Sequence, residues 1–139
     1  MVGFPGERET DFVNTYNLIE QLPFFDLHVF KYSPRPGTPA ANFDQQVSEI
    51  EKQKRSEMLI NLAAAKQEDF LHRMMGKKVM VLIEKKINND TYLGISDNYL
   101  NIVVSGKNLI PGEFAEFIIT RTNNGKTMGT VYHENNTVG

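Results

Sequence analysis

Cysteine is absent from the 139 residues, and this absence excludes several classes of site. Without thiolates the chain forms no disulfide, no cysteine-ligated zinc site and no cysteine-held iron–sulfur cluster of its own. No run approaches the roughly 20 apolar residues that a membrane-spanning helix needs. The N-terminus also lacks the basic, apolar and small-residue segments of a signal peptide. We therefore expect a cytoplasmic protein with no membrane partner.

The sequence has little excess charge of either sign. The net charge is −2, with 8 basic against 11 acidic residues in 1–75 and 7 against 6 in 76–139. Charge alone therefore does not predict a nucleic-acid binder. The 40% hydrophobic content is enough for one ordinary core, or for two small modules joined by a linker.

The first 32 residues predict a strand–helix–strand unit. The apolar start leads into the turn "GFPGE", and an apolar stripe at helical spacing predicts a helix that ends at Pro23. The stripe consists of Phe12, Tyr16, Ile19 and Leu22. The short aromatic run Leu27–Tyr32 predicts a second strand, parallel to the first. Since Met1 falls where the first strand should already be under way, we expect that a longer fold precedes it.

The rest of the chain predicts a loop, a helix and a barrel. Prolines stiffen residues 32–43, and a helical pattern that includes Val47, Ile50, Leu59 and Leu62 runs from Gln45 to Met75. Five β-rich segments follow Gly76, separated by turn clusters at residues 88–90, 105–106, 111–112 and 123–125. We predict a five-stranded OB-like antiparallel barrel.

Few residues suggest chemistry. Glu7, Glu9 and Asp11 read as solvated acids at a helix start rather than as an acid–base pair. Arg35 follows a predicted parallel strand and could bind phosphate or carboxylate. His28, His72 and His133 share no metal-ligand spacing, and no catalytic triad is identifiable, so we predict no catalytic and no metal-binding residue.

The β-rich part combines basic and aromatic residues. Its lysines and Arg121 lie among Tyr92, Tyr99 and Tyr132. Cations that neutralise phosphates and rings that stack on bases are what binding of looped or single-stranded RNA requires. The alternative is that the lysines keep a barrel soluble while the tyrosines pack its core.

Three motifs in this order resemble one family. "VGFPGERETDF", "LHVFKYSPRPGTPAA" and "GISDNYLNIVV" are similar to the C-terminal part of the radical-SAM tRNA methylthiotransferases, most of all to the branch that modifies threonylcarbamoyladenosine. The resemblance implies the end of a radical-SAM (β/α) barrel over residues 1–43, a helical linker over 44–75, an RNA-binding TRAM barrel over 76–135 and a tail over 136–139.

The resemblance also implies site residues. The candidate contacts to S-adenosylmethionine are Val2, Gly3, Phe4, Val29, Phe30 and Tyr32. The candidate contacts to RNA are Lys77, Lys78, Tyr92, Asn98, Tyr99, Lys107, Arg121 and Lys126, with the anticodon loop of a tRNA as the expected partner.

The lack of cysteine departs from the family, whose members hold 4Fe–4S clusters through thiolates. We therefore expect a fragment that lacks the N-terminal part of the enzyme, is inactive alone and binds no cofactor stably. Two alternatives remain: a free-standing RNA-binding adaptor, or the isopentenyladenosine or ribosomal-protein branch of the same family.

Overall fold

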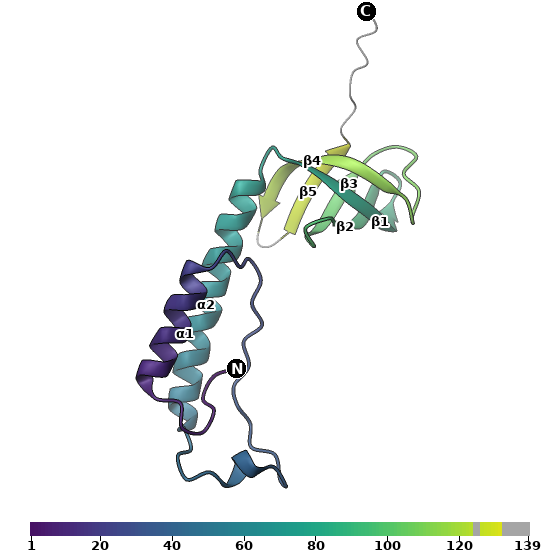
Figure 1. Cartoon of the computed structure of the whole chain (residues 1–139). Coiled ribbons are helices and arrows are strands. Elements are labelled where there is room, and N and C mark those ends of the chain that lie inside the picture. Colours follow the sequence, from purple (N-terminus) through teal and green to yellow (C-terminus); the bar gives the residue numbers. More distant parts are fainter. Residues whose placement is uncertain (124–125, 132–139) are drawn as a thin grey trace, which may run out of the picture. The chain divides into compact units, whose positions relative to one another are not determined.

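A computed structural model describes residues 1–123 and 126–131. The chain divides into two compact units, Met1–Glu68 and Asp69–Gly139, and helix α2 contributes to both. The elements of the described residues are α1 (Glu9–Gln21), the short 3₁₀ helix η1 (Pro39–Asn42), α2 (Glu49–Met74) and strands β1 (Lys78–Asn88), β2 (Thr91–Ser96), β3 (Asn101–Ser105), β4 (Phe114–Asn123) and β5 (Lys126–Val131) (Figure 1). None of the helices among them is long and apolar enough to cross a bilayer.

Helix α1 lies where its stripe predicted it. The Asp11 carboxylate accepts the Arg8 backbone N–H at 2.9 Å, which satisfies one of the free donors of the helix start. At its other end, Lys66 from α2 donates to the carbonyl oxygens of Glu20 and Leu22. Both ends of α1 are therefore capped by side chains, the second of them from the neighbouring helix.

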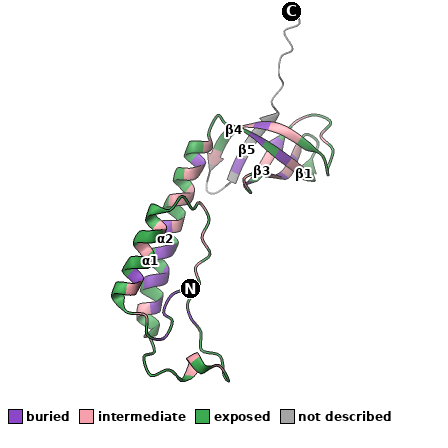
Figure 2. Cartoon of the chain, viewed as in Figure 1, coloured by how far each residue is buried: buried purple, intermediate pink, exposed green. Residues whose placement is uncertain are grey.

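The core of the first unit lies between α1 and α2, where buried residues line the facing sides of the two helices (Figure 2). It consists of Val2, Phe12, Leu59 and Leu62, with Tyr16, Ile19 and Val29 packed against it. Two members of the predicted stripes lie outside it, since Leu22 is 36% exposed and Ile50 is 83% exposed.

The predicted strand over Leu27–Tyr32 is reduced to one residue pair. Val2 and Lys31 form an isolated parallel bridge, so the predicted direction is confirmed while the predicted strand length is wrong. Exposure alternates along residues 27–30, as in extended chain. A ladder needs several consecutive pairs, and Gly3, with a φ of 73°, turns the chain away directly after the bridge.

The second unit is a closed barrel with the strand order β1-β2-β3-β5-β4. Its inward side chains are fully or nearly fully buried: Val79, Val81, Ile83, Tyr92, Ile102, Val104, Phe117 and Ile119. All pairs are antiparallel except β3 with β5, which is parallel. The predicted antiparallel arrangement therefore holds for four of the five strand pairs and is wrong for β3 with β5. An odd number of strands cannot close with every neighbouring pair antiparallel, so one parallel pair is unavoidable.

A bulge in β1 decides which way its lysines face. The register with β2 shifts between Ile83 and Lys85, which leaves Glu84 as the extra residue. Before the bulge, the buried Val81 and Ile83 point inward. After it, Lys86 rather than Lys85 is paired with the buried Tyr92. Lys85 is thereby placed on the outer face, opposite Leu93.

Candidate functional site

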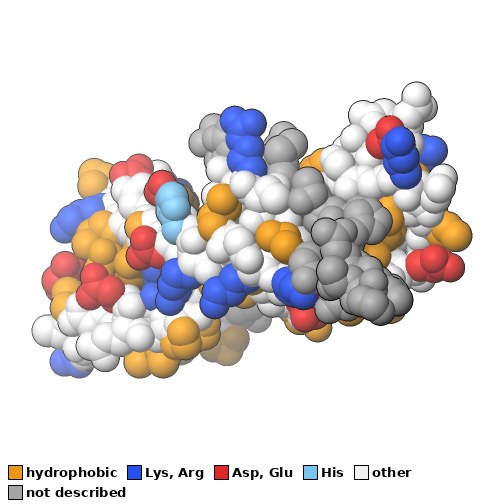
Figure 3. Space-filling view, turned by 90° about the horizontal axis from the view of Figure 1, so that it is seen from above, with side chains coloured by type: hydrophobic (Ala, Val, Ile, Leu, Met, Phe, Trp, Pro, Cys, Tyr) orange, Lys and Arg blue, Asp and Glu red, His pale blue; other side chains and the backbone are white. Residues whose placement is uncertain are grey.

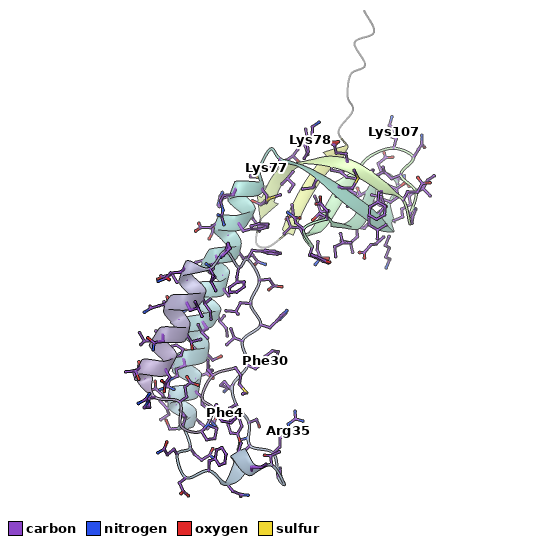
Figure 4. The ribbon with its side chains drawn as sticks, in the orientation of Figure 1. Phe4, Phe30, Arg35, Lys77, Lys78 and Lys107 are labelled. Atoms are coloured by element: carbon purple, nitrogen blue, oxygen red, sulfur yellow. The ribbon has the colours of Figure 1, made fainter. Side chains whose placement is uncertain are left out.

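A pocket in the first unit lies beside the parallel bridge. It has a volume of about 450 Å³ and is lined by Met1, Phe30, Lys31, Tyr32, Ser33, Arg35, Thr38 and Ala40. Phe30 is 66% exposed, whereas Tyr32 is 7% exposed. The buried Tyr32 hydroxyl has no hydrogen-bond partner among the described residues. The pocket thus combines the open ring of Phe30 with the cation of Arg35 (Figure 4), whereas the Tyr32 hydroxyl is closed off from solvent.

Two backbone hydrogen bonds hold the predicted cofactor residues together. The Val2 N–H donates to the Phe30 carbonyl oxygen at 2.8 Å, and the Tyr32 N–H donates to the Val2 carbonyl oxygen at 2.8 Å. The bridge therefore joins three of the six predicted residues. The side chains of Val2 and Val29 belong to the hydrophobic core instead, so that of these four residues Phe30 and Tyr32 line the pocket.

The remaining two predicted residues form the turn after the bridge. The Glu7 carboxylate accepts the backbone N–H of Gly3 at 2.6 Å and that of Phe4 at 3.3 Å. The Phe4 ring meets the Tyr32 ring edge-on, with centroids 5.3 Å apart, and approaches Phe43 at 6.4 Å. The turn therefore supports the wall of the pocket that Tyr32 forms.

Two buried cations on α2 were not predicted from the sequence. Lys52 is 2% exposed and Arg55 is 4% exposed. The Lys52 ammonium lies 2.8 Å from the Glu49 carboxylate and 5.3 Å from the centre of the Tyr32 ring, a cation–π distance. The available signal was spacing: Lys52 and Arg55 precede Leu59 by seven and four residues, which places all three on one helix face.

Arg55 binds three carboxylates. Its guanidinium contacts Glu7 at 3.0 Å, Glu51 at 3.2 Å and Glu9 at 3.3 Å, and also donates to the Glu7 carbonyl oxygen at 3.0 Å. The Glu7 side chain is only 15% exposed. The prediction that Glu7 is a solvated acid was therefore wrong, whereas the Glu9 side chain is 57% exposed as predicted.

Hydrogen bonds from cations lower the pKa of two carboxyls of this unit. Arg8 lowers the pKa of Asp11 chiefly through a side-chain hydrogen bond, and Asp11 raises that of Arg8. Lys52 lowers the pKa of Glu49 in the same way. Both carboxyls are thereby held in the charged form.

The predicted RNA-binding cations whose side chains the structure describes do not form one patch. Lys77 and Lys78 lie at the start of β1, and Lys107 lies at the opposite end of the barrel (Figure 4). Lys78 pairs with Glu116 at 3.4 Å, and Arg121 is exposed on β4. On the face drawn in Figure 3, Lys and Arg side chains are scattered among uncharged and acidic ones. The side chain of Lys126, like Tyr132 and His133, lies outside the described residues.

The predicted aromatic residues have different roles. Tyr92 is 2% exposed, and the Lys86 ammonium lies 5.6 Å from the centre of its ring. Its ring is packed in the barrel, so the prediction of a stacking ring is wrong at this position and the packing alternative holds. Tyr99 is 78% exposed and is free to stack.

Tyr99 is presented by a tightly bonded turn between β2 and β3. The Tyr99 N–H donates to the Ser96 carbonyl oxygen at 2.9 Å, and the Leu100 N–H donates to the Ser96 hydroxyl at 2.9 Å. Asn98 accepts from the same hydroxyl. The φ of Tyr99 is 63°, which is rare for a bulky residue and is held only where the surroundings fix it. The turn thus holds the backbone of the exposed Tyr99 in a strained conformation.

The chain offers no thiolate ligand, and the described residues contain no His/Asp/Glu cluster that could hold a metal ion. An iron–sulfur cluster therefore does not fit the residues of this chain.

No protein-family model matches the chain, but curated proteins do. It is 34% identical over 125 residues to the threonylcarbamoyladenosine tRNA methylthiotransferase of Bacillus subtilis, covering 87% of this chain and 28% of that protein. It is 38% identical over 130 residues to the tRNA-2-methylthio-N(6)-dimethylallyladenosine synthase of Jannaschia sp., covering 93% of this chain and 28% of that protein. The same kind of synthase from Neorickettsia sennetsu is 49% identical over 86 residues, covering 62% of this chain and 18% of that protein.

These similarities cover both units of the chain. The chain nevertheless spans less than a third of the length of the curated relatives it matches. The homologues of this chain are therefore tRNA methylthiotransferases, which it matches over a minor part of their length.

Proposed function

We propose that this chain supplies the tRNA-binding barrel and one wall of the adenosyl pocket of a tRNA methylthiotransferase. The observation that carries the proposal is the similarity to such enzymes over 87% of the chain, together with an exposed ring, Tyr99, at the position that the resemblance assigned to RNA. The proposed partner is the anticodon loop of a tRNA.

The barrel supports RNA binding through its topology. The strand order β1-β2-β3-β5-β4 with a parallel β3–β5 pair supports an OB-like barrel of the TRAM type, and OB folds bind oligonucleotides on the face of strands 2 and 3. Here that face carries the half-buried Leu93, Ile95 and Val103, with Tyr99 at its turn. Apolar surface with one exposed ring suits unpaired bases.

The pocket of the first unit supports contact with S-adenosylmethionine. Phe30 offers an open ring face for an adenine, and Arg35 offers a cation for the carboxylate of the methionyl part. Bound there, the cofactor would supply the methyl group and the radical. This chain's residues would hold and orient it, while the thiolates of any 4Fe–4S cluster must come from outside this sequence.

For the substrate we propose N6-threonylcarbamoyladenosine next to the anticodon, on the resemblance of "GISDNYLNIVV" to that branch. Relatives of similar identity act, by their names, on threonylcarbamoyladenosine and on dimethylallyladenosine. Anticodon stem-loops that carry one or the other modification separate the two branches by their affinity for the chain.

The RNA-binding proposal is tested with Tyr99→Gly. Glycine removes the ring and also relieves the left-handed backbone, so the barrel should be no less stable by thermal unfolding. Affinity for a fluorescent anticodon stem-loop should fall about 5- to 150-fold, which corresponds to the roughly 1–3 kcal/mol of one stacked base. Tyr99→Phe should bind as the parent chain does. An unchanged affinity of the glycine variant would contradict the proposal.

A second candidate function is a free-standing RNA-binding adaptor. The observation that favours it is the separate core of the first unit, built from Val2, Phe12, Leu59 and Leu62. Limited proteolysis distinguishes the two functions. If residues 1–43 resist cleavage as firmly as the barrel, the adaptor is favoured; rapid cleavage there favours the enzyme segment.

A further inference from the structure

We propose that Glu7 and Arg55 form a positioning pair through which helix α2 sets the geometry of the pocket beside the parallel bridge. The inference rests on the proposed function only for the identity of the ligand. The pocket, the turn and the pair are features of the structure itself.

The first step is that the Glu7 carboxylate accepts hydrogen bonds from several donors. One carboxylate oxygen accepts the backbone N–H groups of Gly3 and Phe4, and the other accepts from Arg55 at 3.0 Å. Charge-assisted hydrogen bonds are the strong ones. Glu7 therefore joins the backbone of the turn to the guanidinium of α2 through a single side chain.

The second step is the burial of Arg55. Its side chain is 5% exposed and lies with its guanidinium carbon 5.5 Å from the centre of the Phe12 ring. A guanidinium fixed between a ring and three carboxylates has few alternative positions. It therefore gives Glu7 a fixed partner, which a solvated lysine would not.

The third step leads from the turn to the pocket. Phe4 packs edge-on against Tyr32, and Tyr32 donates its backbone N–H to Val2, which precedes the turn. The stem of Lys52, one helical turn before Arg55, fills the space beside Gly3. The turn is thus held from α2 at two points, and a shift of Glu7 displaces the wall that Tyr32 contributes.

The alternative is that the pair merely adds stability to the first unit. The two alternatives differ in what they predict for Glu9, which also binds Arg55 but accepts no backbone N–H of the turn in the described contacts. If the pair only stabilises the first unit, Glu7→Gln and Glu9→Gln should affect the stability and structure of that unit in the same way. If it positions the pocket, only Glu7→Gln should change the turn and the pocket.

The experiment compares the amide NMR spectra of the full chain with those of Glu7→Gln and of the matched control Glu9→Gln. Glutamine has one acceptor oxygen for donors on both sides, so it must turn its own N–H groups toward one of them. In Glu7→Gln we expect the Gly3 amide to move upfield and to exchange about 10- to 150-fold faster, the equivalent of one charge-assisted hydrogen bond. The Phe30 and Tyr32 amides should shift as well.

In Glu9→Gln the same amides should keep their positions, with exchange changed by less than about threefold, as for an exposed pair. Equal changes in both variants, or none at Phe30 and Tyr32 in Glu7→Gln, would overturn the proposal. If Glu7→Gln does not fold, Arg55→Lys tests the same point, because lysine keeps the positive charge but lacks the planar guanidinium that can bind several acceptors at once.

A titration with millimolar S-adenosylhomocysteine separates this inference from the proposed function. Shifts of the Phe30 and Tyr32 amides in the parent chain, weakened in Glu7→Gln but not in Glu9→Gln, would support both. If the ligand leaves the parent spectrum unchanged, the adenosyl assignment fails, while the ligand-free comparison still decides whether the pair positions the pocket.

Discussion

Replacing Gly3 by alanine should destabilise the first unit through two separable effects. The φ of Gly3 is 73°, and a left-handed conformation costs a residue with a Cβ about 1–2 kcal/mol. The new Cβ would also overlap the Lys52 stem at its Cγ atom. Overpacking of this kind costs about 1–3 kcal/mol, because Lys52 is buried and cannot swing into solvent.

The two costs are partly offset in the unfolded chain. Alanine restricts that chain more than glycine does, which favours folding by about 0.4–1 kcal/mol. The net cost of Gly3→Ala is then about 3 kcal/mol. In the Lys52→Ala background the overlap is gone, so the same substitution should cost only about 1 kcal/mol.

Hydrogen–deuterium exchange measured peptide by peptide is the assay, because it reports on α1 and the first part of α2 separately from the barrel. A cost of 3 kcal/mol accelerates exchange through unfolding roughly 150-fold, and 1 kcal/mol about fivefold. Barrel peptides serve as the internal control. Equal acceleration by Gly3→Ala in both backgrounds would refute the steric argument, and no acceleration in either would refute the backbone argument too.

Two further substitutions probe the barrel and the start of α1. A Cβ on Gly94 would lie 2.6 Å from the Leu82 carbonyl oxygen and 2.6 Å from a Val81 methyl, so Gly94→Ala should destabilise the barrel by about 1–3 kcal/mol. A Tm that falls by less than about 4 °C would contradict this. The hydrogen bond from Arg8 lowers the pKa of Asp11 below its ordinary value of 3.8. The stability from this pair is therefore present above the unfolded pKa and is lost as pH falls through the lowered folded value. Asp11→Asn should remove this acid-dependent part, which circular dichroism of α1 during acid titration checks.

The elements of the fold were largely predictable because their signals are local. Helix α1 follows from an apolar stripe that ends at a proline, and the strands follow from β-rich runs separated by turn residues. The extended segment before Tyr32 has a strand-like pattern too, but pairing depends on a partner, and Val2 offers only one bridge. Composition cannot tell how many consecutive pairs a partner supplies.

The candidate site was predictable only in part, because burial of polar and aromatic side chains is decided by tertiary packing. Tyr92 near the start of β2 and Tyr99 in the turn after β2 are the same residue type in one hairpin, yet one is 2% and the other 78% exposed. Strand alternation would have placed Tyr92 inside once the register was known. Lys52 and Arg55 were missed because cations on a helix are usually solvated.

The position of β5 between β3 and β4 has a consequence for synthesis of the chain. Until residues 126–131 have left the ribosome, β3 and β4 each present a row of unpaired backbone groups, and such edges recruit other chains. The sheet of a nascent chain therefore stays open until β5 is available, even after its other four strands have been made. Closure must follow translation of this segment, and slow elongation or premature termination there would favour aggregation over folding.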